Sequence, residues 1–441
     1  MPPRRYLTAA AVVAAASCLG VQAVPAAAAD SAPVVSRGVT IPAFYTPPAE
    51  LPAADGALIR SEPLPLALSL PGLDGPLPGR ATRLMYRSTD ANGLPVAVTG
   101  AYIEPAARWK GGGPRPLVVV APGTMGQGDQ CAASLGLEHP VTLNGQTVTV
   151  GYEDLSVYRL LASGVAVAVT DYAGLGATDR LHTYVNRVDE AHAVLDAARA
   201  ARSVEGASVT AASRVGLYGY SQGGGATAAA AELQPSYAPD VALAGTYAGA
   251  PPANLTEVTK GIDGTELAGA LGWSLNGFLQ TDPELRPIAE AHLDAAGKAA
   301  LADLSTMCVG DAILHYGYAR STRWTTDGES LSDIIAATPA LQDFLDTQRI
   351  GRLEPAGPVR VATGTSDNLV PHGQARQLAV DWCRKGADVT YKPVLLPNVV
   401  SPLLNHVGPL AADLDPAVSW LTDRLAGKPA ASNCATLPLQ P

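Results

Sequence analysis

A single serine stands between glycines at the point where an apolar run changes into an alanine-rich one, in "RVGLYGYSQGGGATAAAAEL" (residues 214–233). The first part is typical of a buried β-strand and the second of a helix. A sharp strand-to-helix turn brings the two backbones close together, which requires glycines beside it. The chain has 44 glycines, so the motif alone is weak evidence. The strand and helix around it favour a nucleophile over a small turn residue, and Ser221 is the predicted nucleophile.

The same alternation of strands and helices continues along most of the chain. Asn92-Gly93 joins two strands within residues 83–105 as a hairpin, because this dipeptide favours positive backbone torsions. Strands that alternate with helices form a parallel sheet covered on both faces. Short apolar runs typical of such strands are found at 115–124, 164–176, 214–220, 240–254, 357–367 and 388–396, and helical spacing at 186–202 and 372–386.

Residues 255–349 break this pattern, since they contain helical stretches and no apolar run of the buried-strand kind. A helical insertion before the last strands is how a lid is built over a site at the carboxyl ends of a parallel sheet. We therefore predict an α/β fold with a mostly parallel central sheet and helices on both faces. Residues 30–254 and 350–441 are expected to form its core, and residues 255–349 a helical cap.

The amino terminus has the layout of a secretory signal peptide. Arg4 and Arg5 precede an apolar stretch of alanine and valine that ends in small residues at Ala29. We expect cleavage after Ala29 and secretion of the mature chain, residues 30–441. Pro25 and the dominance of alanine argue against a membrane anchor.

Charge and cysteine content argue against a nucleic-acid partner and against a metal site. Removal of residues 1–29 takes away two arginines and no acid, so the net charge changes from −10 to −12. A surface this acidic repels phosphate groups, which argues against a nucleic-acid partner. The four remaining cysteines contain no CxxC pair, so in an oxidising compartment two disulfides are more plausible than a metal site or free thiols.

A serine nucleophile needs a base, and the base needs an orienting acid. In a strand-turn-helix arrangement these residues follow in the order Ser, Asp or Glu, His. Asp367 ends the strand pattern at 357–367, on the sheet edge where Ser221 lies, and His406 lies after the last strand, in a loop before a helix at 416–426. We predict Asp367 as the acid and His406 as the base. The alternative base is His372, which we interpret as a surface or cap residue.

The negative charge of a tetrahedral intermediate needs two hydrogen-bond donors. One is the backbone N–H of Gln222, directly after the nucleophile, and the other is expected from the loop after the strand at 115–124. Thr124 is the predicted second donor, and Met125 and Gly126 are alternatives. Asp171 also ends a strand, but it precedes Ser221, so we expect it to shape a loop.

With these residues assembled, the chain resembles the secretory lipase family of α/β-hydrolases, the lipase A type, over nearly all of the mature chain. The resemblance rests on "APGTMGQGDQC", "DYAGLG", "GYSQGG", "GTSDNLVP", the "NH" at the predicted base and the helical insertion. It implies the α/β-hydrolase fold and a triad of Ser221, Asp367 and His406. It also implies the disulfide pairs Cys131–Cys308 and Cys383–Cys434.

The resemblance implies hydrolysis of carboxylic esters through an acyl-enzyme, with small-molecule or lipid esters as substrates and with neither a metal nor an organic cofactor. It also leaves room for a transient contact with a lipid surface. Alternatives are acyl transfer to another alcohol, peptide hydrolysis by the same machinery, and a secreted binding protein on a hydrolase scaffold. Cutinases share the "GYSQG" turn but are far shorter and lack a cap. The sequence does not determine the oligomeric state.

Overall fold

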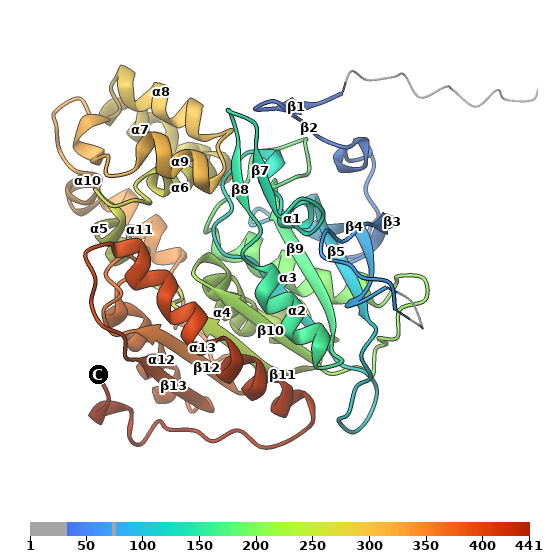
Figure 1. The fold of residues 1–441 in the computed structure, drawn as a ribbon. Coiled ribbons are helices and arrows are strands. Elements are labelled where there is room, and N and C mark those ends of the chain that lie inside the picture. The colour runs from blue at the N-terminus through green and yellow to red at the C-terminus, as the bar shows by residue number, and fades with distance from the viewer. Residues whose placement is uncertain (1–32, 73–75) are drawn as a thin grey trace, which may run out of the picture. The chain divides into compact units, whose positions relative to one another are not determined.

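Nine strands form one mixed sheet, in the spatial order β13-β12-β11-β10-β6-β9-β5-β4-β3 (Figure 1). The computed structural model describes residues 33–72 and 76–441, and the predicted signal peptide, residues 1–29, lies outside them. Neighbours from β13 to β9 pair in parallel, and β5, β4 and β3 are added antiparallel. The strands are β3 (Leu58–Leu64), β4 (Gly79–Thr89), β5 (Pro95–Pro105), β6 (Leu117–Ala121), β9 (Ala166–Ala173), β10 (Val215–Tyr220), β11 (Leu243–Gly249), β12 (Val359–Gly364) and β13 (Val389–Val394).

Strand β6 explains why the central strands read as continuous apolar runs. Leu117, Val119 and Ala121 pack into the core on the face covered by α3, α4 and α12, whereas Val118 and Val120 pack into the core on the opposite face, with α1, α2 and α13. All five are fully buried, as expected for a strand covered on both sides. The predicted parallel sheet with helices on both faces is confirmed. The helices are α1 (Ala133–Glu138), α2 (Asp154–Ala162), α3 (Arg187–Ala201), α4 (Gln222–Tyr237), α12 (His372–Arg384) and α13 (Pro402–Leu425).

Two short hairpins escaped the sequence analysis, in contrast to the hairpin of β4 and β5. That hairpin turns at Asn92-Gly93 as predicted, and Gly93 has a positive φ of 77°. The unpredicted hairpins consist of strands two or three residues long, too short for an alternating pattern. They are β1 (Val35–Ser36) with β2 (Val39–Thr40), and β7 (Val141–Leu143) with β8 (Val148–Val150).

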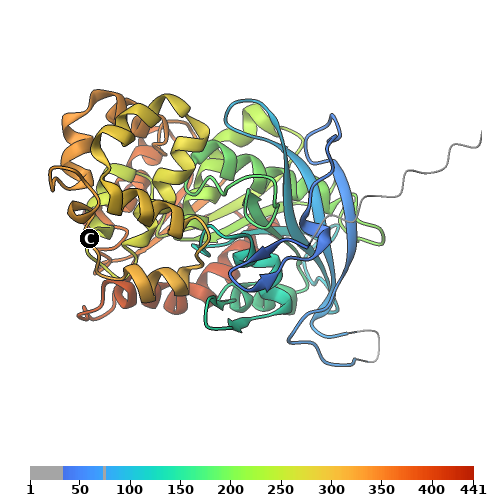
Figure 2. The ribbon, with the colours of Figure 1, turned by 90° about the horizontal axis from the view of Figure 1, so that it is seen from above.

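The stretch between β11 and β12, which the structure describes in full, contains helices, turns and isolated β-bridges but no strand. They gather at one end of the molecule, away from β3, β4 and β5 (Figure 1, Figure 2). The helices are α5 (Leu255–Ile262), α6 (Gly269–Thr281), α7 (Arg286–His292), α8 (Ala295–Leu304), α9 (Val309–Tyr316), α10 (Leu331–Ala337) and α11 (Pro339–Thr347).

The last helix is longer than predicted. We expected His406 in a loop before a helix at 416–426, but α13 begins at Pro402 and includes His406. Ser401 caps its first turn, and proline is well tolerated at the first helical position. Pro409 and Pro416 lie inside the helix without ending it. Each removes one backbone hydrogen bond, and burial of one face of the helix against the sheet offsets that loss.

Two disulfide bonds are present. Cys131–Cys308 joins the segment after β6 to the start of α9, and Cys383–Cys434 joins α12 to the carboxyl-terminal tail. Their Cα–Cα distances are 5.4 Å and 5.5 Å, within the ordinary range for a disulfide.

Loss of the Cys383–Cys434 bond is expected to destabilise the protein. The bond spans 51 residues, and a closed loop of that length contributes about 4 kcal/mol in the chain-entropy model. The variants Cys383→Ala, Cys434→Ala and the double variant break the same bond. Urea unfolding should therefore give equal losses for all three. Additive losses, or unchanged midpoints, would contradict the prediction.

Candidate active site

The backbone turns sharply at Ser221, between β10 and α4, with φ 57° and ψ −124°. Residues other than glycine rarely adopt this conformation. The surrounding backbones are in contact: a Cβ atom on Gly219 would lie 2.1 Å from the Gly223 carbonyl oxygen, and one on Gly223 would lie 2.0 Å from that of Ala121. Close approach therefore requires these two glycines, and it holds the serine between the end of a strand and the start of a helix.

The structure brings Ser221, His406 and Asp367 into one hydrogen-bonded chain. His406 Nε2 lies 2.8 Å from Ser221 Oγ, and His406 Nδ1 lies 2.7 Å from Asp367 Oδ2. Asp367 accepts two further hydrogen bonds at Oδ1, from the backbone N–H groups of Leu369 and Val370. Asp367 and His406 are 4% and 3% exposed. The carboxylate therefore accepts a hydrogen bond from Nδ1–H, and Nε2 is left to accept the serine proton.

Gln222 and Thr124, the predicted oxyanion donors, line the same cavity as Ser221. Gln222 is the first residue of α4, where a backbone N–H has no acceptor within the helix. The two alternatives to Thr124, Met125 and Gly126, do not line this cavity. Both pair with the segment between β11 and β12: the Met125 carbonyl accepts a hydrogen bond from Val309 N–H, and Gly126 pairs with Cys308.

Four side chains hold the loop that carries Thr124. Tyr172 donates to the Pro122 carbonyl (2.7 Å), and Tyr152 donates to the Thr124 carbonyl (3.0 Å). Glu153 accepts from Gly123 N–H (2.7 Å), and the Tyr184 and Thr124 hydroxyls lie 2.7 Å apart. Hydrogen bonds along consecutive residues leave this loop little freedom, which is what preorganised oxyanion stabilisation needs.

Two glutamates near the site are buried, and neither forms an ion pair within the described part of the chain. Glu153 holds the Thr124 loop, and Glu190 of α3 accepts a hydrogen bond from the Gln222 side chain (2.7 Å). Burial raises the pKa of Glu153 to about 7 and the pKa of Glu190 to about 8. Burial also lowers the pKa of His182, which lies beside Gln222, to about 4. At neutral pH Glu190 and His182 are therefore mostly uncharged, and Glu153 is only partly ionised.

Apolar side chains form the rest of the Ser221 cavity, mainly from the helices between β11 and β12. A second hollow follows it between α5, α6, α10 and α11. The residues that line both are Thr259, Leu271, Ser274, Phe278 and Leu345. The second hollow is also lined by Leu275, Leu285, Leu331, Ile335, Leu341 and Phe344.

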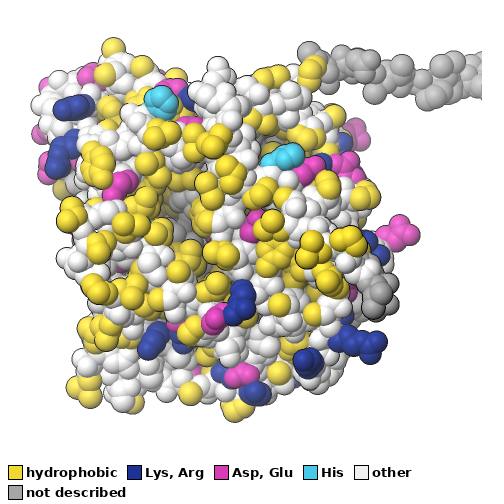
Figure 3. Space-filling view, in the orientation of Figure 1, with side chains coloured by type: hydrophobic (Ala, Val, Ile, Leu, Met, Phe, Trp, Pro, Cys, Tyr) yellow, Lys and Arg dark blue, Asp and Glu magenta, His cyan; other side chains and the backbone are white. Residues whose placement is uncertain are grey.

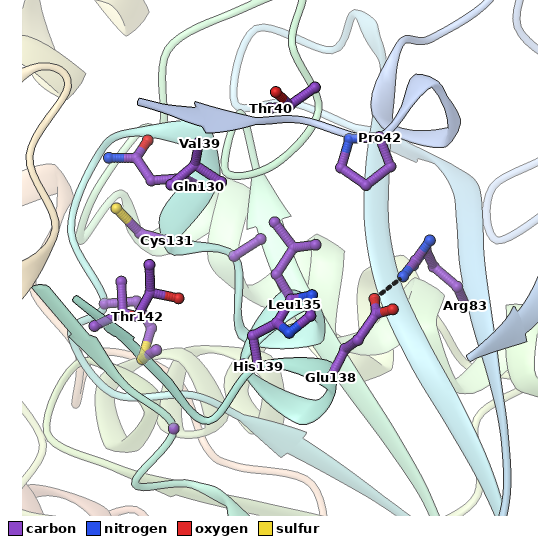
Figure 4. Close-up of a pocket in the computed structure, with 15 residues that line it drawn as sticks. Val39, Thr40, Pro42, Arg83, Gln130, Cys131, Leu135, Glu138, His139 and Thr142 are labelled. Atoms are coloured by element: carbon purple, nitrogen blue, oxygen red, sulfur yellow. Dashed lines mark hydrogen bonds and ion pairs between the residues drawn. The ribbon is translucent and has the colours of Figure 1, made fainter. Parts of the chain in front are cut away.

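A different hollow, of about 180 Å³, lies under the amino-terminal strand β2 (Figure 4). Val39 and Thr40 cover it, Cys131 borders it, and an ion pair of Arg83 with Glu138 lies at its edge. Neither Ser221 nor His406 lines it.

The remaining candidates lie outside the hydrogen-bonded chain. His372 begins α12, and its Nε2 atom lies 3.2 Å from the Tyr391 hydroxyl. Asp171 accepts hydrogen bonds from the backbone and side chain of Ser134 at α1, in keeping with its predicted role in shaping a loop. Sequence analysis missed Glu153, Glu190 and His182. Glu153 and Glu190 lie at the starts of α2 and α3. Acidic side chains are usually exposed, so only the fold reveals that these two residues and His182 are buried.

Neither a membrane span nor a metal cluster was found in the described part of the chain. Among residues 33–72 and 76–441, every helix is too short or too polar to span a bilayer. Over the same residues, no group of three or more His, Cys, Asp or Glu side chains is arranged to hold a metal ion.

A serine on a strand-to-helix turn, hydrogen-bonded to a histidine and an aspartate after later strands of a mostly parallel sheet, defines the α/β-hydrolase class. Within this class, the chain belongs to the secretory lipase family, whose sequence model matches residues 137–433.

Two curated relatives agree with this assignment, and a solved structure shares the fold. The chain is 32% identical to the "Probable inactive lipase MT1628" of Mycobacterium tuberculosis, covering 88% of this chain and 82% of that protein. It is 26% identical to Lipase 10 of Candida albicans, covering 90% and 84%. Its fold is similar to that of Candida antarctica lipase A in its closed state, with a TM-score of 0.74 at 22% identity, over 88% of this chain and 87% of the other.

Stability is expected to fall as the pH rises from 6 to 9. Because the pKa values of Glu153 and Glu190 are raised by burial, the folded protein keeps protons that the unfolded chain has lost above about pH 4.5. Their contribution is complete below that pH and is lost as the pH passes 7 to 8. Urea unfolding at pH 6 and pH 9 should show a smaller decrease for Glu190→Gln than for the wild type.

The exposed Glu290 provides the control for this measurement. Glu290→Gln should retain the full wild-type decrease between pH 6 and pH 9. A Glu190→Gln variant as pH-dependent as the wild type would show that Glu190 is ionised in the folded protein throughout this range.

Proposed function

We propose that this protein is a secreted serine hydrolase that cleaves carboxylic esters through an acyl-enzyme. The observation that carries the proposal is the hydrogen-bonded chain of Ser221, His406 and Asp367 at the edge of an apolar cavity. Such a chain activates a serine toward a carbonyl carbon. An apolar cavity beside it suits the acyl part of an ester.

In the proposed reaction, Ser221 Oγ attacks the ester carbonyl while His406 Nε2 accepts its proton. Asp367 keeps Nδ1 protonated and stabilises the imidazolium that forms. The backbone N–H groups of Gln222 and Thr124 stabilise the oxyanion. His406 then returns the proton to the departing alcohol, and a water molecule, activated by the same histidine, releases the acid from Ser221.

We further propose that residues 255–349 form a cap whose interior holds the acyl chain. The two hollows share five lining residues and follow one another from Ser221 into the cap. Each buried methylene contributes about 0.8 kcal/mol to binding. The proposed substrates are therefore lipid or other esters with medium or longer acyl chains.

The surface beside His406 supports an apolar substrate. Residues 393–412 contain no Asp, Glu, Lys or Arg. Leu395 and Leu404 are exposed in this stretch, and Val400 is fully exposed. Figure 3 shows hydrophobic side chains spread around a hollow on the face where α13 lies in front of the sheet. We propose that this face makes a transient contact with lipid surfaces.

We also propose that the chain is secreted. The two disulfide bonds support secretion, because such bonds persist in oxidising compartments outside the cytosol.

The M. tuberculosis relative is named a probable inactive lipase, so the first measurement is whether this protein hydrolyses esters at all. Ser221→Ala and His406→Ala should each lower kcat on p-nitrophenyl esters by about 10⁴-fold or more, because triad members act as a unit. His372→Ala should retain near wild-type kcat, which controls for the loss of a histidine. An inactive wild type, or loss of activity only in His372→Ala, would contradict the proposal.

Acyl-chain preference tests the proposed cap. We expect kcat/KM to increase from p-nitrophenyl acetate to at least the hexanoate, because longer chains reach the second hollow. Leu275→Asp and Phe278→Asp place a charge in that hollow and should flatten the increase more than they affect acetate. Leu314 is exposed on α9 and lines neither hollow, so Leu314→Asp should retain the increase. A steady decrease from acetate onward would indicate a small-ester esterase.

A further inference from the structure

The side chain of Gln222, the residue after the nucleophile, is anchored at two points behind the catalytic turn. Gln222 is 3% exposed. Its Nε2 atom lies 2.7 Å from Glu190 Oε1 and 3.1 Å from His182 Nε2. In the proposed mechanism only the backbone N–H of Gln222 takes part, and the two hydrogen bonds of its side chain are not used.

Both acceptors are themselves held in place. His182 Nδ1 lies 3.0 Å from the Ala173 carbonyl and donates to it, which leaves Nε2 as an acceptor. Glu190 Oε1 also accepts from Val185 N–H, at 2.9 Å. Each hydrogen of the Gln222 amide therefore has its own acceptor, one on α3 and one in the segment that follows β9.

The first turn of α4 offers no other side chain for such an anchor. Gln222 is followed by Gly223, Gly224 and Gly225; a neighbouring backbone approaches the first two closely, and the Pro252 ring approaches the third. Ser221, at the N-cap position, makes no capping hydrogen bond with its side chain. The glycines that follow Gln222 therefore leave its side chain as the one that can anchor this end of the helix.

We propose that the Gln222 side chain, held by Glu190 and His182, is a positioning device that fixes the Gln222 backbone N–H toward the oxyanion. This inference rests on the proposed ester hydrolysis. Gln222 acts here as a positioning residue through its side chain, since that side chain touches neither the reacting atoms nor the triad. Misplacing the donor weakens binding of the tetrahedral state more than binding of the ester.

The test compares Gln222→Met, which keeps the length of the side chain but removes both donors, with Glu190→Gln, which keeps the acceptor. Because burial raises the pKa of Glu190 to about 8, glutamine closely imitates the form present at pH 7. The readouts are kcat and KM on p-nitrophenyl hexanoate, and the affinity for hexylboronic acid, which forms a tetrahedral adduct with a reactive serine.

We expect Gln222→Met to lower kcat and boronate affinity by about 10- to 100-fold with KM within about twofold, less than the loss of a whole oxyanion donor. Glu190→Gln should stay within about threefold of the wild type in both. The control is Gln234→Met, on the same helix, where the amide donates to the Ala238 and Val241 carbonyls. It should leave kcat and boronate affinity unchanged.

Wild-type kcat and boronate affinity in Gln222→Met would overturn the inference, as would a Glu190→Gln variant that is as impaired as Gln222→Met. If Gln222→Met does not fold, Gln222→Asn decides, because its shorter amide cannot reach both acceptors and should give a loss of the same kind. A wild type that binds the boronic acid but hydrolyses no ester would contradict the proposed function alone, and the boronate affinities of the variants would still test the anchor. A wild type that does neither would contradict both.

Discussion

Close contact between glycine backbones at the turn from β10 to α4 is the constraint on which the site depends. Gly219 and Gly223 admit carbonyl oxygens where any Cβ would collide, and this allows Ser221 to adopt a positive φ at the tip of the turn. The turn places the serine at the carboxyl end of the sheet and directs the amino terminus of α4 toward it. His406 and Asp367 then meet Ser221 from α13 and from the loop after β12.

The turn leaves polar groups buried around it, and the protein satisfies them with neutral partners rather than ions. Glu153 receives a backbone N–H of the loop that carries Thr124, and Glu190 receives the amide of Gln222. Burial raises the pKa of both glutamates, so both are substantially protonated near neutral pH. An ionised carboxylate behind the donors would oppose an oxyanion in front of them, which gives a physical reason for this arrangement.

The helices between β11 and β12 are tied to the same loop. Val309 N–H bonds the Met125 carbonyl, Gln127 N–H bonds the Met307 carbonyl, and the Cys131–Cys308 disulfide lies beside them. A movement of these helices therefore acts on the residues next to Thr124. The geometry of the proposed oxyanion donors and that of the apolar hollows are mechanically linked, because one covalent bond and a short backbone ladder join them.

The sequence by itself determined the sheet from β4 to β13, the order of its later strands and helices, and the residues that form the hydrogen-bonded chain, but it did not predict the edge strand β3 or the helices α1 and α2. It could do so because buried strands, glycine-flanked turns and the order Ser, Asp, His are local or ordinal patterns. Only the tertiary structure decided that His406 lies within α13, since packing of that helix tolerates Pro409 and Pro416. It also decided that Thr124, rather than Met125 or Gly126, lines the Ser221 cavity. The burial of Glu153, Glu190 and His182 depends likewise on what the fold places over them, and no local pattern in the chain carries that information.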